Sequence, residues 1–124
     1  MKNIKLIVRI LLGIMMVIFG LNKFMNFMPM PPLPAAAQTF FDALINTGYL
    51  MTAVGIVELV TGVLFLLNKY TALAAVILFP VMLNAMMFHL FLAPGGIAPA
   101  LLAVVMTVFV MFSNKDKYQG MLAG

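Results

Sequence analysis

The sequence lacks cysteine altogether and is poor in charge, with only 8% Asp, Glu, Lys and Arg among its 124 residues. Without cysteine there is no disulfide exchange, no thiolate metal site and no cysteine nucleophile. A soluble domain usually carries about 25% charged residues, whereas this chain is 65% hydrophobic. Because a soluble fold of this length could not hide so much apolar surface, we expect one domain, residues 1–124, with the lipid bilayer as its solvent.

Four apolar runs are candidates for membrane-spanning helices, each of which needs about 20 mainly apolar residues. We place them at about residues 4–25, 49–67, 70–92 and 97–112, and the last is short. Strands are disfavoured, because a membrane barrel needs many alternating segments of about ten residues. The sequence therefore predicts an all-α integral membrane four-helix bundle.

The connection at residues 26–48 is the longest, and its proline-rich part, residues 28–34, cannot continue a helix. Phe40, Phe41, Leu44 and Ile45 follow with helical spacing, which predicts a short amphipathic helix at the outer interface. An ordered lid without a ligand is the simpler interpretation of this segment. The alanines at residues 35–37 resemble a cleavage site, but the preceding run is too long for a signal peptide, so we expect it to stay as a span.

The basic residues are few and lie at alternate ends of the predicted spans. Neither residues 26–48 nor residues 93–96 contain Lys or Arg. The positive-inside rule then places both termini in the cytoplasm and explains the net charge of +4 better than a nucleic-acid partner does. Lys23 is the exception on the outer side. The basic residues assigned to the inner side are Lys2, Lys5, Arg9, Lys69, Lys115 and Lys117.

Glu58 is the most informative residue, because a charged side chain at the bilayer centre is costly and marks a functional site by default. It lies about 14 Å into the second span, at 1.5 Å per residue. Gly55 and Gly62 lie on the same helical face, and small residues mark close helix packing in membranes. We therefore expect Glu58 to point into the bundle.

Several polar residues could meet Glu58 there. Lys23 lies on a glycine-lined face of the first span, at a depth that the helical rise puts about 10 Å or more from Glu58. Asn84 lies near the depth of Glu58, and His89 lies at the outer end of the third span. The alternative to a ligand site is a polar network that only holds the helices in register. The candidate site comprises Lys23, Glu58, Asn84 and His89, with Asn22 and Thr61 behind them.

Thirteen methionines raise the alternative of a soft-metal site. The thioethers in "MNFMPM", residues 25–30, could bind Cu(I) with His89 nearby. Methionine is also common filler in apolar cores, and no strict ligand spacing stands out. We therefore predict no metal site, and no catalytic residue either, because no nucleophile has an evident base.

Three motifs, in this order and spacing, resemble the DoxX family of small four-helix bacterial membrane proteins. They are "GLNKF" at residues 20–24, "GIVELVTGVL" at residues 55–64 and "AMMFH" at residues 85–89. The resemblance covers about residues 9–112. It implies a four-helix bundle in the bacterial inner membrane and a link to membrane redox chemistry, because the family takes its name from a subunit of a quinone-reducing thiosulfate oxidoreductase.

The resulting expectation is a non-catalytic accessory or binding protein that holds a quinone, a lipid or another small amphiphile. The resemblance also implies a redox-enzyme partner, and any redox activity would belong to a quinone-linked oxidoreductase of which this chain is a subunit. Two alternatives stay open. One is a proton-coupled transporter, which would act as a homodimer because four helices are few for alternating access; the other is a membrane-protein assembly factor.

Overall fold

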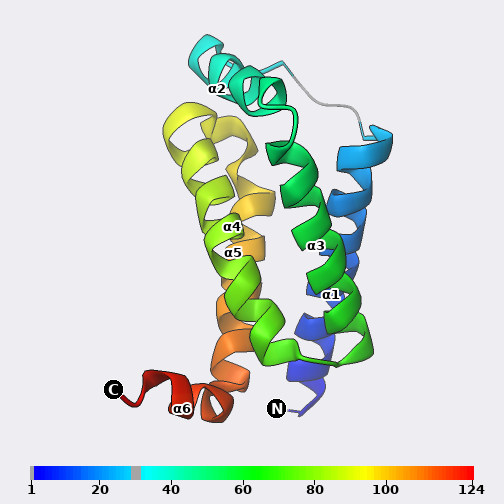
Figure 1. The fold of residues 1–124 in the computed structure, drawn as a ribbon, viewed down its shortest axis with the longest axis vertical. Helices are drawn as coiled ribbons and strands as arrows, with labels where there is room; N and C mark the ends of the chain where they lie inside the picture. Colours follow the sequence, from blue (N-terminus) through cyan, green and yellow to red (C-terminus); the bar gives the residue numbers. More distant parts are fainter. Residues whose placement is uncertain (1, 29–31) are drawn as a thin grey trace.

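Four long helices form an antiparallel bundle (Figure 1). The computed structural model describes residues 2–28 and 32–124. Each long helix, the last one together with a short 3-10 turn before it, is long and apolar enough to cross a membrane. The predicted all-α membrane bundle is thereby confirmed. The helices are α1 (Lys2–Met25), α3 (Leu50–Leu67), α4 (Thr71–Leu92) and α5 (Ile97–Ser113).

The helix ends follow the local sequence. α3 ends at Leu67 because Asn68 adopts a left-handed conformation, with φ of 54°, which asparagine tolerates better than most residues. The 3-10 turn η1 (Pro94–Gly96) precedes α5 and lengthens the short fourth span. The middle of the predicted proline break, residues 29–31, lies outside the described residues.

A shorter helix, α2 (Ala35–Asn46), lies across one end of the bundle and contacts α3 and α4 (Figure 1). It is the amphipathic helix that the spacing of Phe40, Phe41 and Leu44 predicts. Both termini lie at the opposite end of the bundle (Figure 1). There the chain finishes with η2 (Lys115–Tyr118) and α6 (Gln119–Leu122).

Glycines bring α1 and α3 into close contact along the face that the sequence predicts. A Cβ built on Gly13 would lie 3.1 Å from the carbonyl oxygen of Gly62, and one built on Gly20 would lie 3.0 Å from that of Gly55. Such backbone approach is how helices pack in lipid, where apolar side chains gain little by leaving the solvent. The outward-facing apolar residues, such as Ile7 and Val105, are more than half exposed and form the surface that lipid covers.

Candidate functional site

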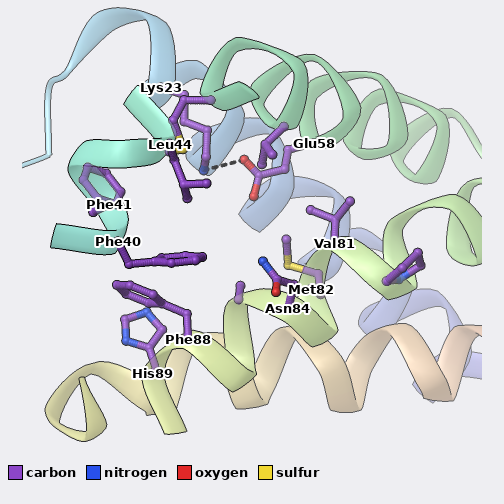
Figure 2. A pocket seen from close by; sticks show the side chains of 14 residues that line it. Lys23, Phe40, Phe41, Leu44, Glu58, Val81, Met82, Asn84, Phe88 and His89 are labelled. Carbon is purple, nitrogen blue, oxygen red and sulfur yellow. Dashed lines mark ion pairs between the residues drawn. The ribbon is translucent and has the colours of Figure 1, made fainter. Parts of the chain in front are cut away.

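Lys23 and Glu58 form an ion pair inside the bundle. The Nζ of Lys23 lies 2.6 Å from Oε1 of Glu58, whose residue is only 2% exposed (Figure 2). Among the described residues, no donor makes a well-aligned hydrogen bond to this oxygen, so the contact is chiefly electrostatic. Glu58 therefore points into the protein, as the sequence predicts, and Lys23 is the group that compensates its charge.

The glycine contacts explain how the two residues meet. A Cβ on Gly55 would lie 3.2 Å from the Cβ of Lys23, so Lys23 is level with Gly55 along the bundle. Glu58 is three residues further along α3, which is roughly 4.5 Å at 1.5 Å per residue. The separation of about 10 Å expected from the sequence is thus too large, and the lysine side chain spans the remaining gap (Figure 2).

A cavity of about 450 Å³ opens beside the ion pair and lies under α2. Its volume is within the range of about 300–1,000 Å³ that is usual for small-molecule sites. The polar wall comes from Lys23, Glu58, Asn84 and His89, so four of the six predicted residues line one space (Figure 2). The rest of the wall is apolar: Phe40, Phe41 and Leu44 from α2, Met51 and Val54 from α3, and Pro80, Val81, Met82, Ala85 and Phe88 from α4.

Aromatic rings in contact with one another lie at the side of the cavity between α2 and α4 (Figure 2). The ring centroids of Phe40 and Phe88 are 5.6 Å apart with an interplanar angle of 33°. Phe88 also meets the His89 ring edge to face, at 5.1 Å and 80°. These contacts couple α2 to the cavity wall. The sequence pattern placed Phe40 in a predicted amphipathic helix, but nothing in the sequence singled out Phe88, because one more apolar residue on an apolar helix gives no signal.

His89 and the ion pair also border a second, smaller cavity of about 250 Å³ on the side of α5. The Nδ1 of His89 lies 3.3 Å from the carbonyl oxygen of Ala93, which ties the ring to the end of α4. Lys23 and Glu58 therefore lie between the two cavities, as part of the wall of each.

Two predicted residues are not in the main cavity. Asn22 lines only the smaller one, and its Oδ1 accepts a hydrogen bond of 2.8 Å from the Met28 amide. Thr61 is 2% exposed and donates to the carbonyl oxygen of Val57 at 2.7 Å. Its hydroxyl is thus satisfied within its own helix, as is common for threonine in membrane helices, and it serves packing more directly than binding.

The described residues contain no group of three or more His, Asp or Glu that could hold a metal ion. Of the methionines in the soft-metal alternative, Met30 lies outside the described residues. What the site does offer is a buried charge pair, an amide and an imidazole beside a mainly apolar space. Such a surface suits a ligand with a polar head and an apolar body.

Comparison with known proteins gives one family. The sequence model described as DoxX matches residues 4–92. This range includes α1 to α4 almost completely and all the residues that line the main cavity. No curated protein and no solved structure is significantly similar to the chain.

Proposed function

The chain belongs to the DoxX family of membrane proteins, and we propose that it is a non-catalytic accessory protein that binds a small amphiphile in the cavity between α2, α3 and α4. A quinone fits this description best, and a lipid is the other candidate. The observation that carries the proposal is the buried Lys23–Glu58 ion pair in the wall of an otherwise mainly apolar cavity. Burying a charge pair in a membrane interior costs free energy. Binding of a polar head group would give the pair a function beyond helix packing.

The cavity matches the two parts of such a ligand. The Lys23 ammonium has three donors, and its contact with Glu58 Oε1 leaves others for a carbonyl or an anionic oxygen. Asn84 and His89 add an amide and an imidazole on the facing wall. Phe40 and Phe88 offer aromatic faces on which a quinone ring could stack. An apolar tail would leave between the helices toward lipid.

The membrane orientation that we propose follows from the distribution of the Lys and Arg residues. All Lys and Arg residues except Lys23 belong to the end of the bundle that holds the termini, or to the α3–α4 connection at that end (Figure 1). By the positive-inside rule this end faces the cytoplasm of a bacterial inner membrane, and the cavity lies in the outer half. A redox-enzyme partner, a homodimer or both would complete the assembly.

The test compares ligands and variants by native mass spectrometry from mild detergent. The main variant is Lys23→Met/Glu58→Leu, because replacing both members of a buried ion pair by apolar residues is often neutral for stability. Asp116→Asn/Lys117→Gln is the matched control, since it also removes one acidic and one basic residue but lies outside the cavity. The ligands are a decyl-substituted ubiquinone analogue and decylbenzene, which has the same tail but no carbonyl group.

We expect the quinone analogue to bind the wild type and the control equally. It should bind the main variant at least about tenfold more weakly, because the variant loses one hydrogen bond to a charged donor. Decylbenzene should not distinguish the variants. Equal quinone binding by all three proteins would overturn the proposal. A partner or dimer peak with no ligand at all would favour the assembly factor, and proton flux in liposomes that depends on Glu58 would favour the transporter.

A further inference from the structure

A cavity of about 330 Å³ lies at the other end of the bundle, where the termini are. It is separate from the site above and shares no residue with it. Three segments contribute to it: the first two turns of α1, the α3–α4 connection with the first residue of α4, and the last turn of α5 with the residue that follows it. The residues that matter are Lys2, Lys5 and Arg9 from the first, Asn68 and Thr71 from the second, and Ser113 and Asn114 from the third.

Its positive charge is concentrated on one face of one helix. Lys2, Lys5 and Arg9 are spaced by three and four residues, which places them on the same side of α1. No Asp or Glu is among the residues that line the cavity. Within residues 2–28 and 32–124, the ion pair found is that of Lys23 and Glu58, at the opposite end. Among the described residues, these three cations thus share a concave space that no carboxylate lines.

Hydrogen-bond donors in this cavity are also available. Arg9 is half-buried and donates from one guanidinium nitrogen to the carbonyl oxygen of Phe65, which fixes the group across α1 and α3. A guanidinium has five N–H donors, so the other donors can bind an anionic oxygen. The side-chain oxygen of Asn68 accepts from Thr71 at 3.1 Å, and this orients the Asn68 amide group, whose NH₂ donates to no residue that the structure describes.

We propose that this cavity binds a phosphate group, namely the head group of an anionic phospholipid. Arginine and lysine converging on a concave surface at the end of membrane helices are the recognised chemistry for such head groups. The positive-inside rule requires only that basic residues be on one side; it does not require them to converge with polar side chains from three segments. Leu6 lines the same cavity and is 50% exposed, so an acyl chain can continue along the apolar surface of α1.

The size agrees with this ligand. A volume of about 330 Å³ corresponds to roughly ten water molecules at about 30 Å³ each, which is enough for a glycerophosphate group. A free phosphate or a soluble phosphate ester has the same recognition chemistry. The experiment must therefore separate a lipid source from a soluble one.

The experiment counts lipids retained on the full chain by native mass spectrometry during titration. The probes are phosphatidylglycerol, phosphatidylcholine of the same chain length, and inorganic phosphate as a competitor. Arg9→Gln also removes the bond to Phe65, so the decisive variant is Lys2→Gln/Lys5→Gln, which changes two exposed side chains. Lys115→Gln/Lys117→Gln is its matched control, because it removes the same charge near the same end but lies outside this cavity.

We expect one phosphatidylglycerol per chain, bound at least tenfold more tightly than phosphatidylcholine. Lys2→Gln/Lys5→Gln should weaken it by about tenfold to 25-fold, since each lysine near such a surface contributes roughly fivefold, and the control should change it less than twofold. Competition by millimolar inorganic phosphate would assign the site to soluble phosphates. Equal weakening in both variants, or equal binding of the two lipids, would overturn the proposal.

Discussion

Gly20 of α1 lies against the backbone of α3, so that a Cβ added to it would approach within 3.0 Å of the carbonyl oxygen of Gly55. This contact sets the register of the two helices on which the ion pair depends. Lys23 is one turn beyond Gly20 and level with Gly55, and Glu58 is one turn further along α3. Because the helices touch here, a lysine near the end of one can reach a carboxylate buried in the other.

Gly20→Ala tests this contact directly. The new methyl group would lie 2.9 Å from the Leu59 amide nitrogen, and a backbone atom cannot give way as a flexible side chain can. Overpacking of this kind costs about 1–3 kcal/mol, and we expect a loss of that size in unfolding experiments in detergent. Gly120→Ala is the control, because nothing lies within 4 Å of its added Cβ. A neutral Gly20→Ala would mean that α1 and α3 are further apart than described.

The Lys23–Glu58 pair should be strongly coupled in a double-mutant cycle. Lys23→Met leaves the 3% exposed Glu58 side chain without a cation, and removing one partner of a buried pair costs about 3–5 kcal/mol. We expect about 3 kcal/mol here, since the Lys23 side chain is 20% exposed and water screens part of its charge. Adding Glu58→Leu should recover most of the loss.

The measurement for this cycle is the free energy of unfolding of the four proteins in the same detergent. Lys69→Met is the matched control for the lysine change, because Lys69 lies in the exposed α3–α4 connection. If the two single losses simply add in the double variant, the residues do not form a pair in the folded protein.

The helices, and the clustering of four of the six candidate residues around one cavity, could be predicted from the sequence because the relevant signals are strong. Apolar runs separated by proline, glycine and polar residues define spans, and a lone carboxylate in such a run must turn inward. The glycine spacing on α1 and α3 also pointed to the observed helix contact. These arguments concern single elements, or pairs of elements with a small repeated motif.

What the sequence could not give is the relative height of the helices and the shape of the spaces between them. The predicted difference in depth between Lys23 and Glu58 was wrong. Counting residues from each predicted helix end ignores the offset between the two helices along the bundle axis. Thr61 was placed in the site by proximity to Glu58, yet its hydroxyl bonds to its own helix. The role of Phe88 is recognised only from the contact of its ring with that of Phe40.

The orientation of the bundle can be measured by cysteine labelling, since the natural chain has no cysteine. Tyr49→Cys and Tyr70→Cys form a matched pair, because these residues are 66% and 73% exposed and flank opposite ends of α3. A membrane-impermeant maleimide should label Tyr49→Cys in intact cells and Tyr70→Cys only after the membrane is opened. The reverse pattern would contradict the orientation that the positive-inside rule predicts.

Tyr118 should make stability fall at high pH. It lies in η2, beyond the last span, where it is 9% exposed and its hydroxyl donates to the carbonyl oxygen of Ala72 at 2.7 Å. Burial raises the pKa of Tyr118 above its ordinary value, which is about 10. The unfolded chain therefore releases the phenol proton first. The stability that this residue adds is complete below about pH 10 and is lost as the pH rises toward the raised pKa.

Tyr118→Phe provides the comparison. Below about pH 10 the variant should be less stable than the wild type by about 1 kcal/mol, the usual contribution of one hydrogen bond, and this difference should shrink as the pH rises further. Unfolding in detergent measures the difference, and near-ultraviolet spectra of the wild type minus the variant follow the phenolate of Tyr118 alone. Tyr70→Phe removes an exposed phenol as the control. A stability difference that stays constant with pH would show that Tyr118 is not held against Ala72.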